Sequence, residues 1–230
     1  MEKIYLIKLG GSLVVPEDGK IDEEYLLKFK NLIEKFVRQK GERFVIVVGG
    51  GWTCRWYQQS AINLGVKNET DLHWIGIMAT WLNAEFIRSI FNSLAHPSGY
   101  FRFDEDIHWK EPVLIAGGWK PDCSTDNDAV ILAEKFGAQT IIVLSNIDYV
   151  YDKDPKKFVD AQPIKHFTWK DYRKFIGVET HTPGLKVPID PVAAKRAEES
   201  KLKVILALGH DLKNLENVLE EKPYKGTTLE

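Results

Sequence analysis

Three short apolar segments of this chain each run directly into glycine. They are Ile4–Lys8 before Gly10-Gly11, Phe44–Val48 before Gly49-Gly50-Gly51, and Pro112–Ala116 before Gly117-Gly118. Segments this short and this apolar are typical of strands buried on both faces of a sheet. In an open α/β sheet, ligands bind outside the carboxyl ends of the strands, where glycine lets backbone N–H groups approach an anion closely. Three glycine runs on one sheet edge therefore predict a polyphosphate site.

Helical segments alternate with strands along the chain. Their apolar periodicity predicts helices at Glu23–Gln39, Thr53–Leu64, Asp71–Leu94, Asp126–Phe136, Asp190–Ser200 and Lys213–Glu220. Further strands are expected at Thr140–Leu144 and Lys203–Leu208, with a terminal edge strand at Gly226–Leu229. This alternation predicts the α/β class, as a three-layer αβα sandwich with a mostly parallel central sheet.

Length and composition narrow the possibilities further. The 230 residues predict a single domain, residues 1–230. Thirty-one Lys and Arg against 33 Asp and Glu give a net charge of −2, which argues against nucleic acid or an anionic membrane as the partner. Cys54 and Cys123 are too few for a disulfide framework or a four-thiolate zinc site. No segment approaches the roughly 18 apolar residues of a membrane span, so we expect a cytoplasmic protein.

Charged residues near the glycine runs have the signs that a phosphate site needs. Lys8 lies within an apolar strand, where an unpaired ammonium is costly, so an anionic ligand is a fitting partner. Arg55 follows the second glycine run by one helical turn. Asp126 and Asp190 open predicted helices, where a carboxylate either caps the helix or organises lysine and metal-bound phosphates. Phosphoryl transfer depends on positioned charges of this kind.

The common phosphate-binding motifs are absent from the sequence. It contains no G-x-x-x-x-G-K-[ST] of the P-loop NTPases and no G-x-G-x-x-G after a strand. The H-R-D loop of the protein kinases is also missing. The predicted phosphate site must therefore belong to another class.

Six segments, in register along the whole chain, carry a resemblance to a known family. They are KLGGSL (Lys8–Leu13), VVGGGWTCRWY (Val47–Tyr57), the DxxxxGIxxTxxNA spacing (Asp71–Ala84), AGGWKPDCSTDNDAV (Ala116–Val130), SNIDYVYDKDPKKF (Ser145–Phe158) and IDPVAAK (Ile189–Lys195). Together they resemble the amino acid kinase superfamily, and within it the uridylate (UMP) kinases of the archaeal type. The resemblance implies a phosphotransferase of pyrimidine biosynthesis that converts ATP and UMP to ADP and UDP, with Mg²⁺ as the cofactor.

The same resemblance implies roles on the ATP side. Lys8 would stabilise the transferring phosphoryl group, Asp126 would organise Lys8 and the metal-bound phosphates, and Asp190 would be a second active-site carboxylate. ATP would be bound by Gly11, Ser12, Gly51, Arg55, Ser145, Asn146, Tyr151 and Asp154. The ATP phosphates, rather than protein side chains, would hold most of the Mg²⁺. We expect the irregular segment 151–189, dense in Lys, Pro and aromatic residues, to form a flap over ATP.

UMP would be bound by a second set of residues. This set is Gly50, Asp71, Trp119, Lys120, Pro121, Asp122, Cys123, Ser124 and Thr125, with Asp71 hydrogen-bonded to the ribose hydroxyls. Trp119–Asp122 stands where the family often has Thr-His-Pro-Gly, and Trp81 stands where archaeal members often have arginine. The Asp126-Asn127-Asp128 run resembles the corresponding segment of glutamate 5-kinase, another member of the superfamily, more than that of the UMP kinases. These departures all fall on the acceptor side.

Two alternatives to a UMP kinase therefore stay open. The first is a kinase of the same fold for another small acceptor, a carboxylate or a phosphate. The second is a non-catalytic storage protein that binds a nucleotide or an oxyanion, against which the presence of Lys8, Asp126 and Asp190 counts. The family resemblance also implies a homo-oligomer, a hexamer built from dimers. The aromatic helix that starts at Asp71 is the kind of surface that such an assembly buries.

Overall fold

The computed structural model describes residues 3–179 and 187–230. Its strands are β1 (Ile4–Leu9), β2 (Arg43–Val48), β3 (Val113–Ala116), β4 (Thr140–Ser145), β5 (Val150–Tyr151), β6 (Pro163–Ile164), β7 (His166–Phe167), β8 (Lys203–Leu208) and β9 (Thr227–Leu229). Its helices are α1 (Gly11–Val14), α2 (Glu23–Lys40), α3 (Gly51–Asn63), α4 (Glu69–Phe91), α5 (Thr125–Phe136), α6 (Trp169–Ile176), α7 (Pro191–Glu199) and α8 (Leu212–Leu219), with a 3₁₀ turn at Asn92–Leu94.

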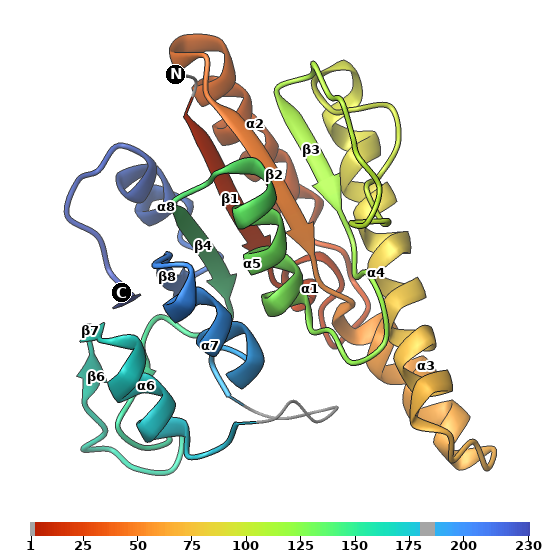
Figure 1. Cartoon of the computed structure of the whole chain (residues 1–230), viewed down its shortest axis with the longest axis vertical. Coiled ribbons are helices and arrows are strands. Elements are labelled where there is room, and N and C mark those ends of the chain that lie inside the picture. The colour runs from red at the N-terminus through yellow and green to blue at the C-terminus, as the bar shows by residue number, and fades with distance from the viewer. Residues whose placement is uncertain (1–2, 180–186) are drawn as a thin grey trace.

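Seven strands form one sheet in the order β3-β2-β1-β4-β8-β9-β7. The first five are parallel, so their carboxyl ends meet at one edge. Helices α5 and α7 pack on one face of the sheet, and α2 and α8 on the other (Figure 1). Strands β2 and β3 are almost wholly buried, as their unbroken apolar sequences indicate. The predicted α/β sandwich with a mostly parallel sheet is confirmed.

The predicted terminal edge strand is wrong in one respect, because β9 is not at the edge. It pairs antiparallel with β8 on one side and parallel with β7 on the other. Strand β7 contains only two residues, His166 and Phe167. A strand of two residues is too short to show the alternation that identifies a strand in a sequence.

Segment 151–189, expected to be irregular, contains ordered elements that join the main core. Strands β5 and β6 form a small antiparallel sheet. Helix α6 begins after Thr168, whose side chain accepts the Asp171 N–H, and ends at Gly177. The buried Tyr172 on this helix donates its hydroxyl to the Ile189 carbonyl. The predicted flap also includes residues 180–186, which lie outside the described residues, so its closure over ATP stays a prediction.

The first two glycine runs pack directly against each other. A Cβ atom added to Gly11 would lie 2.0 Å from the backbone nitrogen of Gly51, and one added to Gly51 would lie 2.4 Å from the Gly11 carbonyl oxygen. Gly51 also has a φ of +60°, in the left-handed region that favours glycine. The side-chain amide of Asn83 donates to the Gly49 carbonyl at 2.9 Å and so ties this junction to α4. The close approach of β1 and β2 therefore requires glycine here, independently of any ligand.

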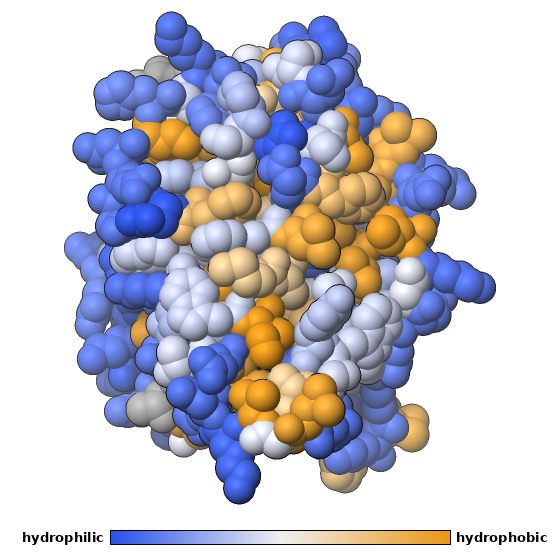
Figure 2. Space-filling view, turned by 90° about the vertical axis from the view of Figure 1, so that its right-hand side faces the viewer, coloured by the Kyte–Doolittle hydropathy of each residue, from blue (hydrophilic) through white to orange (hydrophobic). Residues whose placement is uncertain are grey.

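Helices α3 and α4 leave an apolar surface exposed. None of the residues of α3 is buried. The two helices together expose Trp56, Tyr57, Ile62, Trp74, Met78 and Leu82. Figure 2, which views the molecule from the side of these helices, shows apolar side chains gathered among hydrophilic ones. Within the described ranges, none of the helices combines the length and the apolar character needed to cross a membrane.

The glycine junction yields a stability prediction. We expect Gly11→Ala to destabilise the protein by about 3 kcal/mol or more, since two backbone segments must separate to admit the methyl group. The control is Gly137→Ala, because Gly137 has open space around its Cβ position, so that only the strain of its positive φ opposes a side chain there. The control should cost only about 1–2 kcal/mol. Thermal unfolding of both variants measures the difference, and equal losses would show that the junction tolerates a side chain.

Candidate active site

Lys8, Asp126 and Asp190 lie together at the carboxyl edge of the sheet. The Lys8 ammonium on β1 is 2.9 Å from Oδ1 of Asp126, in the first turn of α5, with the two side chains 18% and 14% exposed. The Asp126 Oδ2 atom accepts the backbone N–H of Asp190 at 3.1 Å. Asp190 itself caps α7, accepting the N–H groups of Val192 and Ala193. A lysine on an otherwise buried strand is tolerated because a carboxylate pairs with it.

Several of the residues predicted to bind ATP lie just after the ends of β1 and β2 and at the end of β4. Gly11 and Gly51 meet at the glycine junction, and Ser12 follows in α1. Ser145 ends β4 beside the end of β8, because its carbonyl accepts the Gly209 N–H at 2.7 Å. The side chains of Ser145 and Asn146 are in contact at 3.4 Å. Their position at the sheet edge fits the predicted adenosine side.

The more distant ATP-side residues make local contacts. The Tyr151 hydroxyl donates to the Asp148 carboxylate at 3.0 Å. Asp154 is exposed and accepts the Lys156 N–H within a turn. The Arg55 guanidinium lies 4.9 Å from the centroid of the Trp52 ring. Their predicted roles toward ATP stay predictions.

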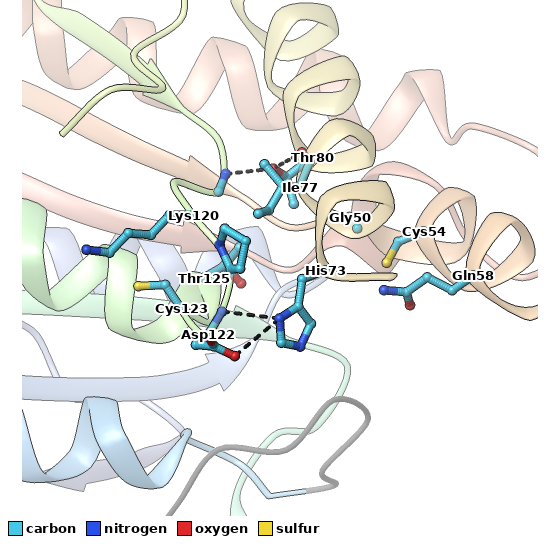
Figure 3. A pocket seen from close by; sticks show the side chains of 13 residues that line it. Gly50, Cys54, Gln58, His73, Ile77, Thr80, Lys120, Asp122, Cys123 and Thr125 are labelled. Carbon is cyan, nitrogen blue, oxygen red and sulfur yellow. Dashed lines mark hydrogen bonds and ion pairs between the residues drawn. The ribbon is translucent and has the colours of Figure 1, made fainter. Parts of the chain in front are cut away.

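A cavity of about 230 Å³ opens beside the glycine junction. Its walls are one face of α3, one face of α4 and the loop that joins β3 to α5 (Figure 3). Helix α3 and the residue before it contribute Gly50, Cys54 and Gln58, and α4 contributes His73, Gly76, Ile77 and Thr80. The loop and the start of α5 contribute Gly118, Lys120, Pro121, Asp122, Cys123 and Thr125. The helix residues recur three or four positions apart, so each set lies on one helix face.

Most of the residues predicted to bind UMP line this cavity. They are Gly50, Lys120, Pro121, Asp122, Cys123 and Thr125. Asp71, Trp119 and Ser124 are not among the lining residues. Asp71 is exposed in the first turn of α4, the Trp119 ring stacks on Phe103, and Ser124 caps α5.

Helix α4 holds the glycine end of the loop that joins β3 to α5 by two hydrogen bonds. The Gly118 N–H donates to the Thr80 hydroxyl at 2.6 Å, and the Trp81 indole N–H donates to the Gly118 carbonyl at 2.6 Å. The Trp81 ring also stacks on Phe101, with the ring centroids 4.8 Å apart. Trp81, one of the departures from the family pattern, therefore fixes the loop backbone by a hydrogen bond.

Asp128 is a buried carboxylate for which sequence patterns predicted no role beyond its place in the Asp126-Asn127-Asp128 run. It accepts the Trp119 N–H at 3.3 Å and the Cys123 thiol at 3.0 Å. Burial raises the pKa of Asp128 to about 7 and also raises the pKa of the Cys123 thiol. Asp128 thus accepts a hydrogen bond from each end of the Trp119–Cys123 segment.

His73 forms the other contact that sequence reasoning missed. Its Nδ1 atom accepts the backbone N–H of Asp122 at 3.2 Å and lies 3.3 Å from Oδ1 of that residue. Asp122 has a φ of +62°, which is uncommon for a residue other than glycine. The spacing of His73, Gly76 and Thr80 on one face of a predicted helix was the available signal in the sequence.

A larger cavity, of about 810 Å³, lies at the opposite edge of the sheet. It is lined by the amino ends of β1, β4 and β8, and by Val218, Glu221 and Tyr224. None of the predicted site residues reaches it. Ligands of open α/β sheets bind at the carboxyl edge, so the smaller cavity is the better candidate site.

Comparisons with known proteins agree with the overall fold. The model of the amino acid kinase family matches residues 3–207. A uridylate kinase of Thermoplasma volcanium is 35% identical over 100% of this chain and 99% of its own length. One of Methanococcus aeolicus is 35% identical over 87% of this chain and 88% of its own length. The crystal structure of the uridylate kinase of Archaeoglobus fulgidus superposes with a TM-score of 0.81 at 30% identity, covering 99% of this chain and 100% of that one.

The raised pKa of Asp128 predicts a pH effect on stability. Between about pH 4 and pH 7 the unfolded chain loses this proton while the folded protein keeps it, so the carboxyl lowers stability as the pH rises. The loss is at most about 1.4 kcal/mol per pH unit. We expect Asp128→Asn to gain stability relative to the unchanged protein between pH 5 and pH 8. Urea unfolding at several pH values measures this gain, and a constant difference would contradict a protonated Asp128.

Proposed function

The chain belongs to the amino acid kinase family and is a kinase, and from this premise we propose that it phosphorylates UMP to UDP with ATP. The observation that carries the proposal is the position of the Lys8–Asp126 pair. It lies between the glycine junction of β1 and β2 and the start of α5, whose first residue, Thr125, lines the acceptor cavity. A donor phosphate at the junction and an acceptor in the cavity would meet at Lys8.

The chemistry needs no nucleophile or base from the protein, because the phosphate of UMP is already ionised. An oxygen of that phosphate forms a bond to the γ-phosphorus of ATP while the bond from this phosphorus to the β-phosphate oxygen breaks, in line. The Lys8 ammonium stabilises the charge that spreads over the transferred group. Asp126 orients Lys8, and the Asp190 N–H in turn orients Asp126.

ATP is proposed to lie along the glycine junction, with its adenosine toward the end of β4. Gly11, Ser12 and Gly51 would contact the phosphates, while Ser145, Asn146, Tyr151 and Asp154 would form the adenosine side. Arg55 would approach the phosphates after leaving the Trp52 ring. The 151–189 segment would cover the bound nucleotide.

Magnesium is proposed to enter with ATP. In the described part of the chain, no three His, Cys, Asp or Glu side chains group together as a metal site would need. Asp126 and Asp190 are the carboxylates beside Lys8, and both already accept backbone or lysine hydrogens. These residues fit a Mg²⁺ ion held mainly by phosphate oxygens, which is its usual arrangement with nucleotides. The ion would neutralise phosphate charge.

An acceptor other than UMP is favoured by one observation. Asp122 places a carboxylate, 90% exposed, at the cavity that would receive a phosphate, and its positive φ is the conformation that glycine adopts without strain. A carboxylate here repels an anionic acceptor unless a cation lies close by. Lys120 is the nearby cation, although its ammonium lies 3.9 Å from the centroid of the Trp119 ring. A small acceptor of lower charge is therefore the second candidate.

The exposed apolar surface of α3 and α4 supports a homo-oligomer. Aromatic residues and methionine are enriched in protein interfaces, and this surface carries Trp56, Tyr57, Trp74 and Met78. We propose that copies of the chain pair through it, as in a hexamer built from dimers. A cytoplasmic location, without a nucleic-acid or membrane partner, stays a prediction.

The identity of the acceptor can be tested with a panel of candidate substrates. An ADP-release assay compares UMP, CMP, glutamate, acetylglutamate and isopentenyl phosphate at equal concentrations. We expect the highest kcat/KM with UMP, since its phosphate can reach Lys8 while its nucleoside fills the cavity. If another compound is phosphorylated and UMP is not, the proposed UMP kinase activity is contradicted and only the assignment to the family stands. No turnover of any compound would favour a storage protein.

Lys8 gives a prediction about the chemical step. We expect Lys8→Ala to lower kcat about a hundredfold or more, with a smaller change in the KM for ATP, because a preorganised donor to the transferred group is lost. Lys3→Ala is the matched control, since Lys3 also belongs to the start of the chain but pairs with Glu221 at the opposite edge. Steady-state kinetics measure both variants. Near-normal turnover by Lys8→Ala would remove Lys8 from the mechanism.

A further inference from the structure

The Trp119–Cys123 segment forms one wall of the acceptor cavity and has a backbone conformation that needs support. In Figure 3 its residues Lys120 and Cys123 lie across the cavity from α3. The Cys123 N–H donates to the Lys120 carbonyl at 3.3 Å and so closes a turn. Asp122, the third residue of this turn, has a φ of +62°, where glycine is the favoured residue. A side chain in this conformation costs free energy, so contacts from outside the turn must stabilise it.

Asp128 supplies such contacts at both ends of the segment. It lies in α5 and is wholly buried. Its Oδ2 atom is 3.3 Å from the Trp119 nitrogen, and its Oδ1 atom is 3.0 Å from the Cys123 sulfur. The side-chain amide of Asn127 donates to the same sulfur at 3.1 Å. Because Asp128 is not among the residues that line the cavity, it can act on an acceptor only through the segment.

Both protonation states of Asp128 can hold the segment. The ionised carboxylate accepts the Trp119 N–H and the Cys123 thiol proton. The neutral carboxyl accepts the same N–H with its carbonyl oxygen and can donate its own proton to the sulfur. An asparagine copies the neutral form, since its amide has one acceptor oxygen and an NH₂ donor group. Asp128→Asn therefore preserves both contacts, whereas Asp128→Ala removes both.

The contacts of Asp128 are separate from those of the Lys8–Asp126 pair. Asp126 precedes Asp128 by two residues on the same helix, which turns the two side chains about 200° apart around the helix axis. Asp126 faces Lys8 and the Asp190 N–H, while Asp128 faces the segment. A change at Asp128 can therefore alter the acceptor wall and leave the residues proposed for phosphoryl transfer in place.

We propose that Asp128 is a positioning residue for the acceptor: it holds the two ends of the Trp119–Cys123 segment and thereby sets how tightly the acceptor binds. This inference rests on the proposed function, since it takes the cavity between α3, α4 and this segment as the acceptor site. The first turn of α5 thus carries two carboxyl groups with different tasks. Asp126 orients Lys8, and Asp128 orients the wall of the cavity.

Three variants test this role. Asp128→Ala removes both contacts with the segment, and Asp128→Asn keeps them. Glu134→Ala is the matched control, because Glu134 lies on the same helix but pairs with Arg196 of α7 and does not line the cavity. Thermal unfolding measures the stability of each variant, and steady-state kinetics give kcat and both KM values. Calorimetry with UMP measures binding directly.

We expect Asp128→Ala to raise the KM for UMP about tenfold, as the loss of one or two net hydrogen bonds predicts. The kcat at saturating UMP and the KM for ATP should change by about twofold or less, because ground-state binding of the acceptor is what is lost. Asp128→Asn should keep a near-normal KM for UMP. Glu134→Ala should also keep it, even where it lowers the unfolding temperature.

A second pair of variants serves if Asp128→Ala does not fold. Cys123→Ala removes the sulfur contact from the side of the segment, while Cys123→Ser restores a donor and an acceptor there. We expect weaker UMP binding by Cys123→Ala and recovery by Cys123→Ser. Equal binding by both variants would show that the contact with Asp128 does not position the segment for the acceptor.

The outcomes separate this inference from the proposed function. If Asp128→Ala keeps the KM for UMP, or changes kcat and the KM for ATP as much, Asp128 has no role specific to the acceptor and the inference is overturned. An equal rise in the KM for UMP with Glu134→Ala would overturn it too, since the cause would be a general loss of stability. If another compound of the panel is phosphorylated and UMP is not, the proposed function fails, and the same comparison made with that compound decides the role of Asp128. If no compound is phosphorylated or bound, both fail.

Discussion

The contact between the two glycine loops is the constraint on which the site depends. The parallel strands β1 and β2 end side by side, and their loops meet so closely that a Cβ atom on Gly11 or Gly51 would overlap backbone atoms of the other loop. This contact brings backbone, rather than side chains, together where the two strands end. Backbone N–H groups at such a junction, followed by helix N-termini, favour an anion. The same packing that joins the strands therefore builds the surface proposed for the phosphates of ATP.

Helix α4 organises the cavity proposed for the acceptor through hydrogen bonds to three separate segments. It contacts the Gly49 carbonyl through Asn83, Gly118 through Thr80 and Trp81, and Asp122 through His73. Asp128 holds the same loop from α5. The acceptor cavity is thus a gap between two helices that is closed by one loop, and the loop is fixed by hydrogen bonds on both sides. Changes at Thr80 and Trp81 are therefore expected to act on acceptor choice rather than on ATP, whereas Asn83 contacts the glycine junction.

Much of the architecture followed from local sequence patterns. The apolar strands and the periodic helices appear where they were predicted, and helices α2 and α5 end at Gly41 and Gly137, both in the left-handed conformation that glycine favours. Lys8 and Asp126 were singled out because each carries a charge at a strand or helix end, and the structure pairs them. Strand β7 was not predicted, because a strand of two residues is too short to show alternation of apolar and polar residues. Helix α6 was not predicted, because it lies in a segment whose dense Lys, Pro and aromatic residues indicate irregular structure.

By itself, the sequence predicted the fold class, the sheet edge at which a ligand is expected, and Lys8 and Asp126 as separate candidate site residues. Those follow from hydrophobic period, glycine and charge, which act over a few neighbouring residues. The tertiary structure alone decided that Gly11 and Gly51 exclude side chains, that Asp128 is buried with a pKa of about 7, and that His73 rather than Asp71 lines the cavity. Each of these depends on groups far apart in the chain. Burial and hydrogen bonding between such groups are properties of packing, and no local pattern encodes them.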